Sequence, residues 1–522
     1  MKTSNYAAFF GSRASRPQFL ISRRKHPLRL RLSLCLVLAG SMTHSAFAQP
    51  QEAWVARYNN GIAKGTNQAV KMALDSNGNI YVTGFSQNAN SNLGYVTIKY
   101  APNGTQLWAS RYDSTNYPAA EPAAMVLDAS NDVIVTGSAL TIKYNCNGNQ
   151  LWTAPYAGTA LAVDSNANVY VAGFSQNFGT EKLTPQGSNV WLTTYTDVGP
   201  TISQSVLVDS GNNVYVSGLD TYYTAYRYTG PYVTLATIQY GSNGNRIWIS
   251  SLNPPPWLQY NSVQVAGAML DGSNNLYLLG NFSGGVSEPY VAFKYSTNGS
   301  LVWTAFPNRN DSSEATALYL DSGANLLITG KAGYYPDSSY GTYKINTGGL
   351  PVWTNCYPQV PVGLSVATSI VTDSANNSYV TGYSPGANSN NDIVTIKYDA
   401  NGNQVWLQCY NGPGNGNDAG NAIAVDSNGN VYVTGYETTA AGGTEIVTIK
   451  YLPVTPIQRQ SDGSILLQAQ GSPGESFDFQ GSADLVNWED LGSVFADTNG
   501  VAQFDDTNAP QYNCRFYTAS PQ

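Results

Sequence analysis

The chain has 522 residues, of which 12% are aromatic and only 11% are charged, and its formal net charge is −8. Fifty glycines and 26 prolines accompany many Asn, Ser, Thr and Tyr residues, a composition typical of a turn-rich all-β protein rather than a disordered chain. An acidic surface repels phosphate backbones and anionic lipids, so we expect no nucleic-acid partner.

Residues 1–48 predict a secretory signal peptide. They contain eight basic residues and no acidic one, and an apolar run follows from Leu32 to Gly40. Ala46-Phe47-Ala48 suits cleavage after Ala48. The apolar run is about half of the ~20 residues that a transmembrane helix needs, so a membrane anchor is the weaker alternative. We therefore expect a secreted protein, periplasmic or extracellular, with no transmembrane segment in the mature chain.

Removal of this segment increases the acidity of the chain and removes its histidines. Of the 25 basic residues, eight lie in residues 1–48, so 17 remain against 33 acidic ones, a net charge of −16. His26 and His44 both lie in the signal, which excludes His-dependent catalysis and His-ligated zinc from the mature chain. Four cysteines remain, and no spacing pairs them, so we expect isolated, half-buried thiols. They are Cys146, Cys356, Cys409 and Cys514.

The body of the chain is a repeat, and residues 422–451 are its clearest copy. Two apolar segments flank the turn Asp-Ser-Asn-Gly-Asn at residues 426–430, and a third ends in Thr-Ile-Lys-Tyr. Asp and Asn side chains bond nearby backbone groups and Gly accepts positive φ, so the turn predicts a hairpin. In the preceding copy a second such turn, residues 399–403, leads to a fourth segment containing Trp406. Four antiparallel strands of this kind predict one propeller blade.

Eight copies of this repeat can be counted. A glycine ends the second strand of each copy at a mean spacing of about 50 residues, within the range of a propeller blade. These are Gly84, Gly137, Gly173, Gly218, Gly280, Gly330, Gly382 and Gly435. An aspartate opens the first turn nine residues before each glycine: Asp75, Asp128, Asp164, Asp209, Asp271, Asp321, Asp373 and Asp426.

A tryptophan marks the fourth strand of seven copies. These residues are Trp108, Trp152, Trp191, Trp248, Trp303, Trp353 and Trp406. The last copy has no tryptophan after Tyr451, but Trp54 begins a matching segment, Trp-Val-Ala-Arg-Tyr, near the N-terminus. We therefore expect residues 54–58 to complete the last blade, which would close the ring and remove an open sheet edge.

These motifs resemble the bacterial β-propeller repeat family known as SBBP, whose core is D-x-x-G-N-x-Y-V-T-G followed by T-I-K-Y. The resemblance covers roughly residues 54–451 of this chain. It implies a secreted or surface module with no common catalytic residue, and usually seven blades. We predict an all-β protein with a propeller of four-stranded blades at residues 49–452, with eight blades by our count and seven as the alternative.

Residues 453–522 predict a small C-terminal β-sandwich-like module. The repeat ends at Pro453, and short β-branched or aromatic segments follow, separated by Gly, Pro and Asn. We expect Trp488 to lie in the core of this module. The stretches 484–488 and 515–517 resemble C-terminal modules of secreted proteins from environmental bacteria.

The second-to-third and blade-to-blade connections should share one face of the propeller. Nearly all variation in loop length falls on this irregular face, the usual place for recognition on a rigid scaffold. Its longest loops supply the candidate ligand-binding residues Tyr222, Tyr223, Tyr232, Trp257, Tyr260, Tyr334 and Tyr335. Tyrosine and tryptophan rings with polar tips suit a glycan or a surface protein, whereas packing of the loops onto the propeller is the alternative.

Metal and cofactor binding are not favoured by the repeats. Calcium needs six to eight oxygen ligands and each turn has one Asp, so we expect hairpin capping, with no metal or other cofactor. The lysine of Thr-Ile-Lys-Tyr is replaced by Gln239 in one copy, and we expect it on the strand surface.

Our preferred interpretation is a non-catalytic, monomeric binding or adhesion scaffold. The alternative is a secreted carbohydrate-active enzyme, which would need paired carboxylates on the irregular face. Candidates there are Asp220, Glu288, Asp311, Glu314 and Asp337, and no pair stands out by its spacing.

Overall fold

The computed structural model describes residues 50–522, apart from fifteen short stretches at most nine residues long. These are residues 174–177, 197–200, 223–231, 253–261, 284–289, 308–312, 334–336, 359–362, 387–389, 454–457, 471–473, 484–486, 498–499, 513–514 and, at the end, 522. The predicted signal peptide lies outside the described residues. Within them, no helix has the length and apolar character of a membrane span.

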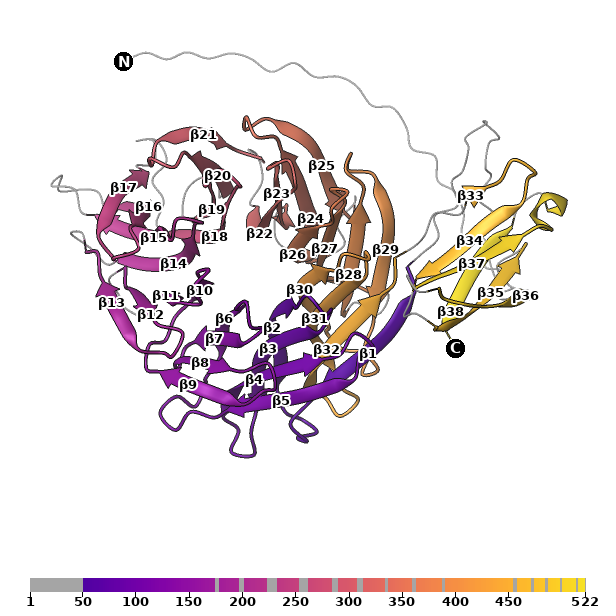
Figure 1. Cartoon of the computed structure of the whole chain (residues 1–522), viewed down its shortest axis with the longest axis horizontal. Coiled ribbons are helices and arrows are strands. Elements are labelled where there is room, and N and C mark those ends of the chain that lie inside the picture. The colour runs from indigo at the N-terminus through magenta and orange to yellow at the C-terminus, as the bar shows by residue number, and fades with distance from the viewer. Residues whose placement is uncertain are drawn as a thin grey trace, which may run out of the picture. The chain divides into compact units, whose positions relative to one another are not determined.

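Eight four-stranded antiparallel sheets make up most of the described chain, and they follow one another around a ring in chain order (Figure 1). Blade one contains β2 (Asn67–Leu74), β3 (Ile80–Gln87), β4 (Leu93–Tyr100) and β5 (Gln106–Tyr112). Blade two contains β6 (Pro122–Leu127), β7 (Val133–Gly137), β8 (Thr141–Tyr144) and β9 (Gln150–Ala154). Blade three contains β10 (Ala160–Val163), β11 (Val169–Ala172), β12 (Thr180–Leu183) and β13 (Asn189–Thr193). Blade four contains β14 (Thr201–Val208), β15 (Val214–Tyr222), β16 (Tyr232–Tyr240) and β17 (Arg246–Leu252).

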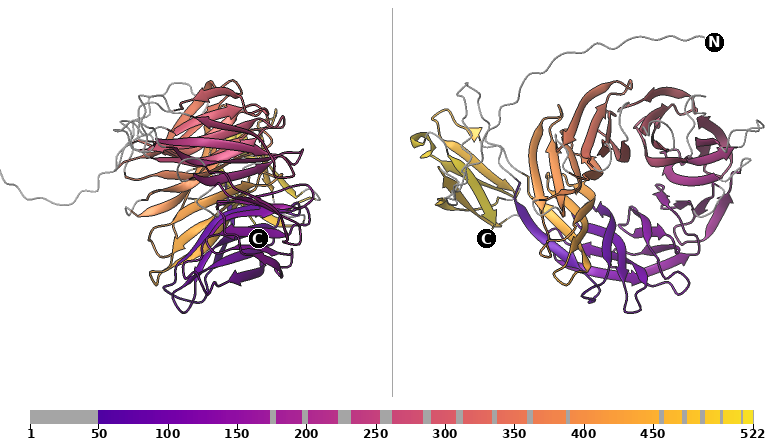
Figure 2. Two further views of the ribbon diagram at one scale, coloured as in Figure 1. Left: turned by 90° about the vertical axis from the view of Figure 1, so that its left-hand side faces the viewer. Right: turned by 180° about the vertical axis from the view of Figure 1, so that it is seen from behind.

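The remaining four blades repeat this order, as the view from behind also shows (Figure 2). Blade five contains β18 (Ser262–Leu270), β19 (Leu276–Ser283), β20 (Tyr290–Tyr295) and β21 (Leu301–Ala305). Blade six contains β22 (Glu314–Leu320), β23 (Leu326–Ala332), β24 (Ser339–Ile345) and β25 (Pro351–Tyr357). Blade seven contains β26 (Val366–Thr372), β27 (Ser378–Pro385), β28 (Asn391–Tyr398) and β29 (Gln404–Tyr410). Blade eight contains β30 (Ala419–Val425), β31 (Val431–Thr438), β32 (Thr444–Tyr451) and β1 (Glu52–Tyr58).

The last blade uses the first strand of the chain, as predicted from Trp54. Strand β1 pairs antiparallel with β32, with Val55 opposite Ile449. Blade eight also contacts blade one, because the Asn421 side chain donates a 2.8 Å hydrogen bond to the carbonyl of Ala69. The described chain therefore has eight four-stranded sheets, the number of repeats counted in the sequence.

The aspartate turns form as hairpins for the reason that their sequence indicates. Asp75 Oδ1 accepts hydrogen bonds from the backbone amides of Asn77 and Asn79, both at 2.9 Å. Gly78 adopts φ of +75°, a conformation open to glycine at no steric cost. The side chain of the aspartate therefore caps its own turn and fixes the register of the first two strands.

The recurring tryptophan joins seven of the eight blades to the next by one hydrogen bond. Trp108 Nε1 donates a 3.0 Å hydrogen bond to the carbonyl of Cys146 in the third-to-fourth turn of blade two. Its ring lies against Gly148 of that turn, where an added Cβ would sit 2.6 Å from a ring carbon. The same hydrogen bond is made by Trp54, Trp152, Trp191, Trp248, Trp303 and Trp353. The turn glycine therefore serves both the hairpin and the contact between blades.

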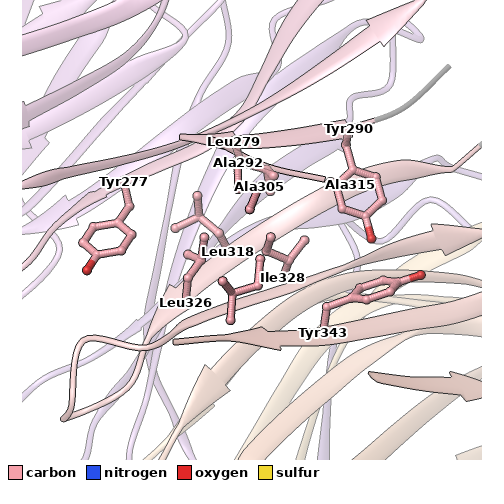
Figure 3. Close-up of a cluster of buried hydrophobic side chains, with 11 residues drawn as sticks. Tyr277, Leu279, Tyr290, Ala292, Ala305, Ala315, Leu318, Leu326, Ile328 and Tyr343 are labelled. Carbon is pink, nitrogen blue, oxygen red and sulfur yellow. The ribbon is translucent and has the colours of Figure 1, made fainter. Parts of the chain in front are cut away.

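The hydrophobic cores lie between neighbouring sheets. Between blades five and six, Tyr277, Leu279 and Tyr290 of one blade pack with Leu326, Ile328 and Tyr343 of the next, as Figure 3 shows. Burial of large apolar side chains between sheets, at roughly 25 cal/mol per Å² of apolar surface, stabilises this repeated arrangement.

The C-terminal residues form two three-stranded sheets. One contains β33 (Gln458–Arg459), β34 (Ile465–Gln470) and β37 (Val501–Asp506); the other contains β35 (Ser476–Ser482), β36 (Glu489–Phe495) and β38 (Phe516–Pro521). A short 3-10 helix, η1 (Ala509–Gln511), precedes β38. Phe479 of one sheet stacks on Phe504 of the other, with ring centroids 5.6 Å apart. The placement of Trp488 in this core was wrong: it is 40% exposed, because smaller side chains and these phenylalanines fill the space between the sheets.

Candidate functional site

The irregular face carries the predicted aromatic patch, most of which lies outside the described residues. Tyr223, Trp257, Tyr260, Tyr334 and Tyr335 all fall in those undescribed stretches. The structure does bring Tyr222 and Tyr232 together, because they are opposite one another at the end of the β15–β16 ladder. The patch itself therefore stays a prediction.

The β15–β16 hairpin of blade four reaches beyond the short strands of the neighbouring blade three on this face. Both strands have nine residues, whereas β11 and β12 of blade three have four each. Counted from the turn aspartates Asp164 and Asp209, β15 ends five residues later than β11. At ~3.3 Å per residue, this difference makes the hairpin about 16 Å taller. The irregular face is thus uneven where blades three and four meet.

The carboxylates proposed for an enzyme do not share one role in the structure. Glu314 lies 3.6 Å from Lys331, and its side chain is 55% exposed. Asp337 accepts a hydrogen bond from the backbone amide of Gly363 at 2.8 Å. Asp220 is buried in β15. Glu288 and Asp311 lie outside the described residues.

The placement of the motif lysines on the strand surface was wrong for the four that are buried: Lys99, Lys143, Lys182 and Lys344. The other three are half-buried: Lys294, Lys397 and Lys450. Lys143 Nζ lies 2.7 Å from Asp128 Oδ2, and the Lys344–Asp321 distance is 2.9 Å. Longer pairs, of 3.6 to 3.8 Å, join Lys99 to Asp75, Lys182 to Asp164 and Lys294 to Asp271. The third strand is internal to its sheet, and each lysine reaches back to the aspartate of the first turn.

A buried tyrosine completes this pairing in most blades. Lys99 Nζ lies 4.7 Å from the ring centre of Tyr81, and similar contacts occur at Tyr170, Tyr277, Tyr379 and Tyr432. Burial raises the pKa of Tyr215 to about 12, with help from the nearby Asp209 carboxylate. Burial would raise the pKa of Asp321, but hydrogen bonds from Lys344 and Asn325 outweigh it and hold that pKa below the ordinary value.

The turn carboxylates use their oxygens within their own hairpins. Asp75 Oδ2, for example, accepts a 2.8 Å hydrogen bond from the Asn79 side chain while Oδ1 caps the backbone. Among the residues that the structure describes, no three His, Cys, Asp or Glu side chains gather as a metal ion would require. Hairpin capping thus accounts for the repeated Asp and Asn residues.

A charged cluster that the sequence analysis missed lies at the hairpin of blade eight. Arg57 Nε of β1 lies 2.5 Å from Glu437 Oε1 of β31, and Arg57 Nη2 donates to the Tyr410 hydroxyl at 2.7 Å. Tyr410 in turn donates to Glu437 Oε2 at 2.5 Å. Glu445 is opposite Glu437 in the ladder and accepts a 3.0 Å hydrogen bond from Asn59. Arg57 thereby ties the N-terminal strand to blades seven and eight.

Two carboxylates share this cluster, so its charge depends on protonation. Burial raises the pKa of Glu445, and the adjacent Glu437 raises it further. Burial also raises the pKa of Glu52 on β1. The sequence does contain a signal for this cluster. Glu437 and Glu445 lie at equal distances from the turn at residues 438–444, so a hairpin with this register places them opposite one another.

A second buried carboxylate, Glu181, lies between blades two and three. It replaces the isoleucine of Thr-Ile-Lys-Tyr and is fully buried. Its Oε1 accepts a 2.5 Å hydrogen bond from the Asn189 side chain. Burial raises the pKa of Glu181, although hydrogen bonds from Asn189 and Tyr156 act in the opposite direction.

The structure describes three of the four cysteines. Cys146 and Cys409 form no disulfide among the described residues, as expected, and Cys356 and Cys409 are more exposed than the half-buried state that we predicted. They lie near the outward ends of fourth strands, where alternate side chains meet solvent. Cys514 lies outside the described residues.

The comparisons with known proteins support the propeller fold and leave the ligand open. Residues 412–436 match the SBBP family, described as a beta-propeller repeat. None of the curated proteins matches the sequence. Similar solved structures include a eukaryotic initiation factor, with 11% identity, a TM-score of 0.41 and coverage of 86% of this chain and 90% of that one.

Two further structures have unrelated activities. A puromycin hydrolase is 12% identical, with a TM-score of 0.43 over 67% of this chain and 59% of that chain. Drosophila Plexin A, solved in complex with Semaphorin 1b, is 10% identical, with a TM-score of 0.40 over 76% of this chain and 87% of that chain. With TM-scores below 0.5, these likenesses carry no argument about this chain. The chain is an all-β protein with four-stranded propeller blades and a match to the SBBP beta-propeller repeat.

Proposed function

We propose that this chain is a secreted bacterial scaffold without catalytic activity, which binds a glycan or a surface protein through its irregular face. The observation that carries the proposal is the unequal height of that face: the β15–β16 hairpin extends five residues beyond the matching strand of blade three. Functional loops on rigid scaffolds vary in this way, whereas the turns of the opposite face repeat nearly unchanged.

The uses of the buried charges support a binding role over an enzymatic one. The turn aspartates cap hairpins and pair with lysines, and Glu437 is held by Arg57 and Tyr410. A glycoside hydrolase needs one carboxyl free to donate a proton and a second free to attack or to activate water. The nominated Glu314 and Asp337 are each engaged by a local partner.

The experiment is a glycan array probed with the mature protein, residues 49–522, with and without calcium. We expect specific binding that Trp257→Ala and Tyr223→Ala each weaken at least tenfold, a loss of about 1.4 kcal/mol. The matched control is Phe495→Ala, because Phe495 is an exposed aromatic side chain of the C-terminal module and does not belong to the irregular face. An array without signal would reject the glycan, and cell-surface proteins would then be tested with the same three variants.

A carbohydrate-active enzyme remains the competing class, and the same preparation tests it. The glycans bound on the array are incubated with the protein and their reducing ends are counted. Release of sugar would contradict the non-catalytic proposal. Loss of that release on substitution of either Glu314 or Asp337 would identify the carboxylates responsible.

A further inference from the structure

The junction between blades five and six lacks a side chain found at most other junctions. In six blades a tyrosine follows the tryptophan by four residues, within the fourth strand or just after it: Tyr58, Tyr112, Tyr156, Tyr195, Tyr357 and Tyr410. The Tyr112 ring packs 5.9 Å from that of Tyr95, and Tyr357 packs 5.9 Å from Tyr340. Blade five has Pro307 at this position.

A tyrosine from the neighbouring blade takes over the contact. Tyr343 occupies a position of β24 that is isoleucine in five other blades, and its ring lies 5.8 Å from that of Tyr290, edge to face. Gly341 makes room for it, because a Cβ there would lie 2.8 Å from the Tyr343 ring. Figure 3 shows Tyr290 and Tyr343 facing each other from the two blades.

This exchange leaves a cavity of about 380 Å³ beside Pro307. Its lining includes Phe306, Pro307, Tyr343, Leu350, Pro351 and Thr354. The volume falls within the range of small-ligand pockets, and the walls combine apolar side chains with the polar Thr304, Lys344 and Thr354. Leu350 is 64% exposed, so an apolar side chain of the lining is in contact with solvent.

The cavity adjoins an open sheet edge. Strand β21 is the last strand of its sheet and is paired on one side only, with β20. Leu301 and Val302 on this strand are exposed, and residues 301–307 contain no charged side chain. Charged residues are a common means of blocking an edge strand, whereas an extended peptide can add to an edge that lacks them.

We propose that this cavity is a binding site for an aromatic side chain of a partner protein, whose extended segment lies along β21. The argument for an aromatic ring comes from the chain itself: six other blades place a tyrosine at the position of Pro307. The site lies on outer strands and is independent of the function proposed for the irregular face.

The first test uses p-cresol, the side chain of tyrosine without its backbone, titrated into the mature protein and followed by ligand-observed NMR. We expect saturable binding that Pro307→Tyr weakens at least tenfold, because the new side chain fills the cavity. Leu252→Tyr is the matched control, since it adds the same ring at the equivalent position of blade four. Absence of p-cresol binding, or equal binding to Pro307→Tyr, would overturn the proposal.

A second variant separates occupation of the cavity from misfolding. Leu350→Glu places a charge on an exposed lining residue without altering the buried core, and it should also weaken binding at least tenfold. The partner is tested with an uncharged peptide, Val-Thr-Tyr-Val-Thr, blocked at both ends. It should bind at least tenfold more tightly than p-cresol because its backbone can pair with β21. Equal affinity would overturn the role of the strand edge and leave a small aromatic molecule as the occupant.

Discussion

Lys143 Nζ lies 2.7 Å from Asp128 Oδ2, and both side chains are buried beneath the tryptophan strand of blade two. The two residues come from the first turn and the third strand of one repeat. Lys143 also lies 3.3 Å from Asp132 Oδ2. Removal of the lysine therefore leaves the buried Asp128 carboxylate without its countercharge inside the sheet, which explains why the pair recurs.

Substitution of Lys143 by alanine should therefore destabilise the protein strongly. Breaking a buried pair costs ~3–5 kcal/mol, because Asp128 would remain buried without its countercharge. Lys143→Gln should cost less, because blade four already carries Gln239 at this position. Urea unfolding measures the loss of stability in both variants.

The control for this pair is Lys331→Ala, which breaks the exposed contact with Glu314. Surface pairs contribute ~0–1 kcal/mol, so this variant should unfold close to the wild type. If Lys143→Ala were as stable as Lys331→Ala, the buried pair would have no structural role.

Gly148→Ala should destabilise the contact between blades one and two. The new Cβ would lie 2.6 Å from the Trp108 ring, in addition to the strain of φ at +83°. Gly442→Ala is the matched control, since Gly442 has φ of +85° and no atom within 4 Å of an added Cβ. Strain alone costs of order 1–3 kcal/mol, and Gly148→Ala should exceed its control by at least ~1 kcal/mol in unfolding free energy. Equal losses would show that the tryptophan contact is dispensable.

Glu181 should make the stability of the protein depend on pH. Its pKa is raised in the folded state, above about 4.3 in the unfolded chain. The stability that protonated Glu181 contributes is therefore fully present below its pKa in the unfolded chain, and it is lost as the pH rises through its pKa in the folded protein. Glu181→Gln keeps the shape and stays neutral, so it should lose less stability than the wild type between pH 4.5 and 8.

Thermal unfolding across that range is the measurement, with Glu121→Gln as the control because Glu121 is exposed. The control should follow the wild-type curve. A Glu181→Gln curve parallel to that of the wild type would show that Glu181 does not titrate between the folded and unfolded states.

The regular parts of this fold were predictable because each repeat encodes them locally. Asp426 and Gly429 define a hairpin by short-range chemistry, and Trp54 matches the missing tryptophan of blade eight. The eight-blade count and the pairing of β1 with β32 followed from that periodicity. No knowledge of side-chain packing was needed.

The errors arose where packing between elements decides the outcome. The sequence of its strand predicts Lys143 on the surface. In the structure it is buried, paired with Asp128 of the first turn and opposite Trp152 of the fourth strand. Glu437 and Arg57 lie 380 positions apart in sequence, and their contact depends on the pairing of β1 with the last blade. Tyr343 packs on Tyr290 in place of the tyrosine that blade five lacks at Pro307. This contact likewise involves two blades, so no single repeat predicts it.

The most direct test of the binding role is removal of the tall hairpin of blade four. Replacement of residues 220–234 by Asn-Gly joins Leu219 to Leu235, which are opposite one another in the ladder, through a two-residue turn. The matched deletion shortens the β31–β32 hairpin of blade eight by replacing residues 439–443 with Asn-Gly. The affinity of both proteins for the ligand found on the glycan array or among surface proteins is then measured. The account predicts at least a tenfold loss for the blade-four deletion alone, whereas unchanged affinity in that variant would contradict recognition at this hairpin.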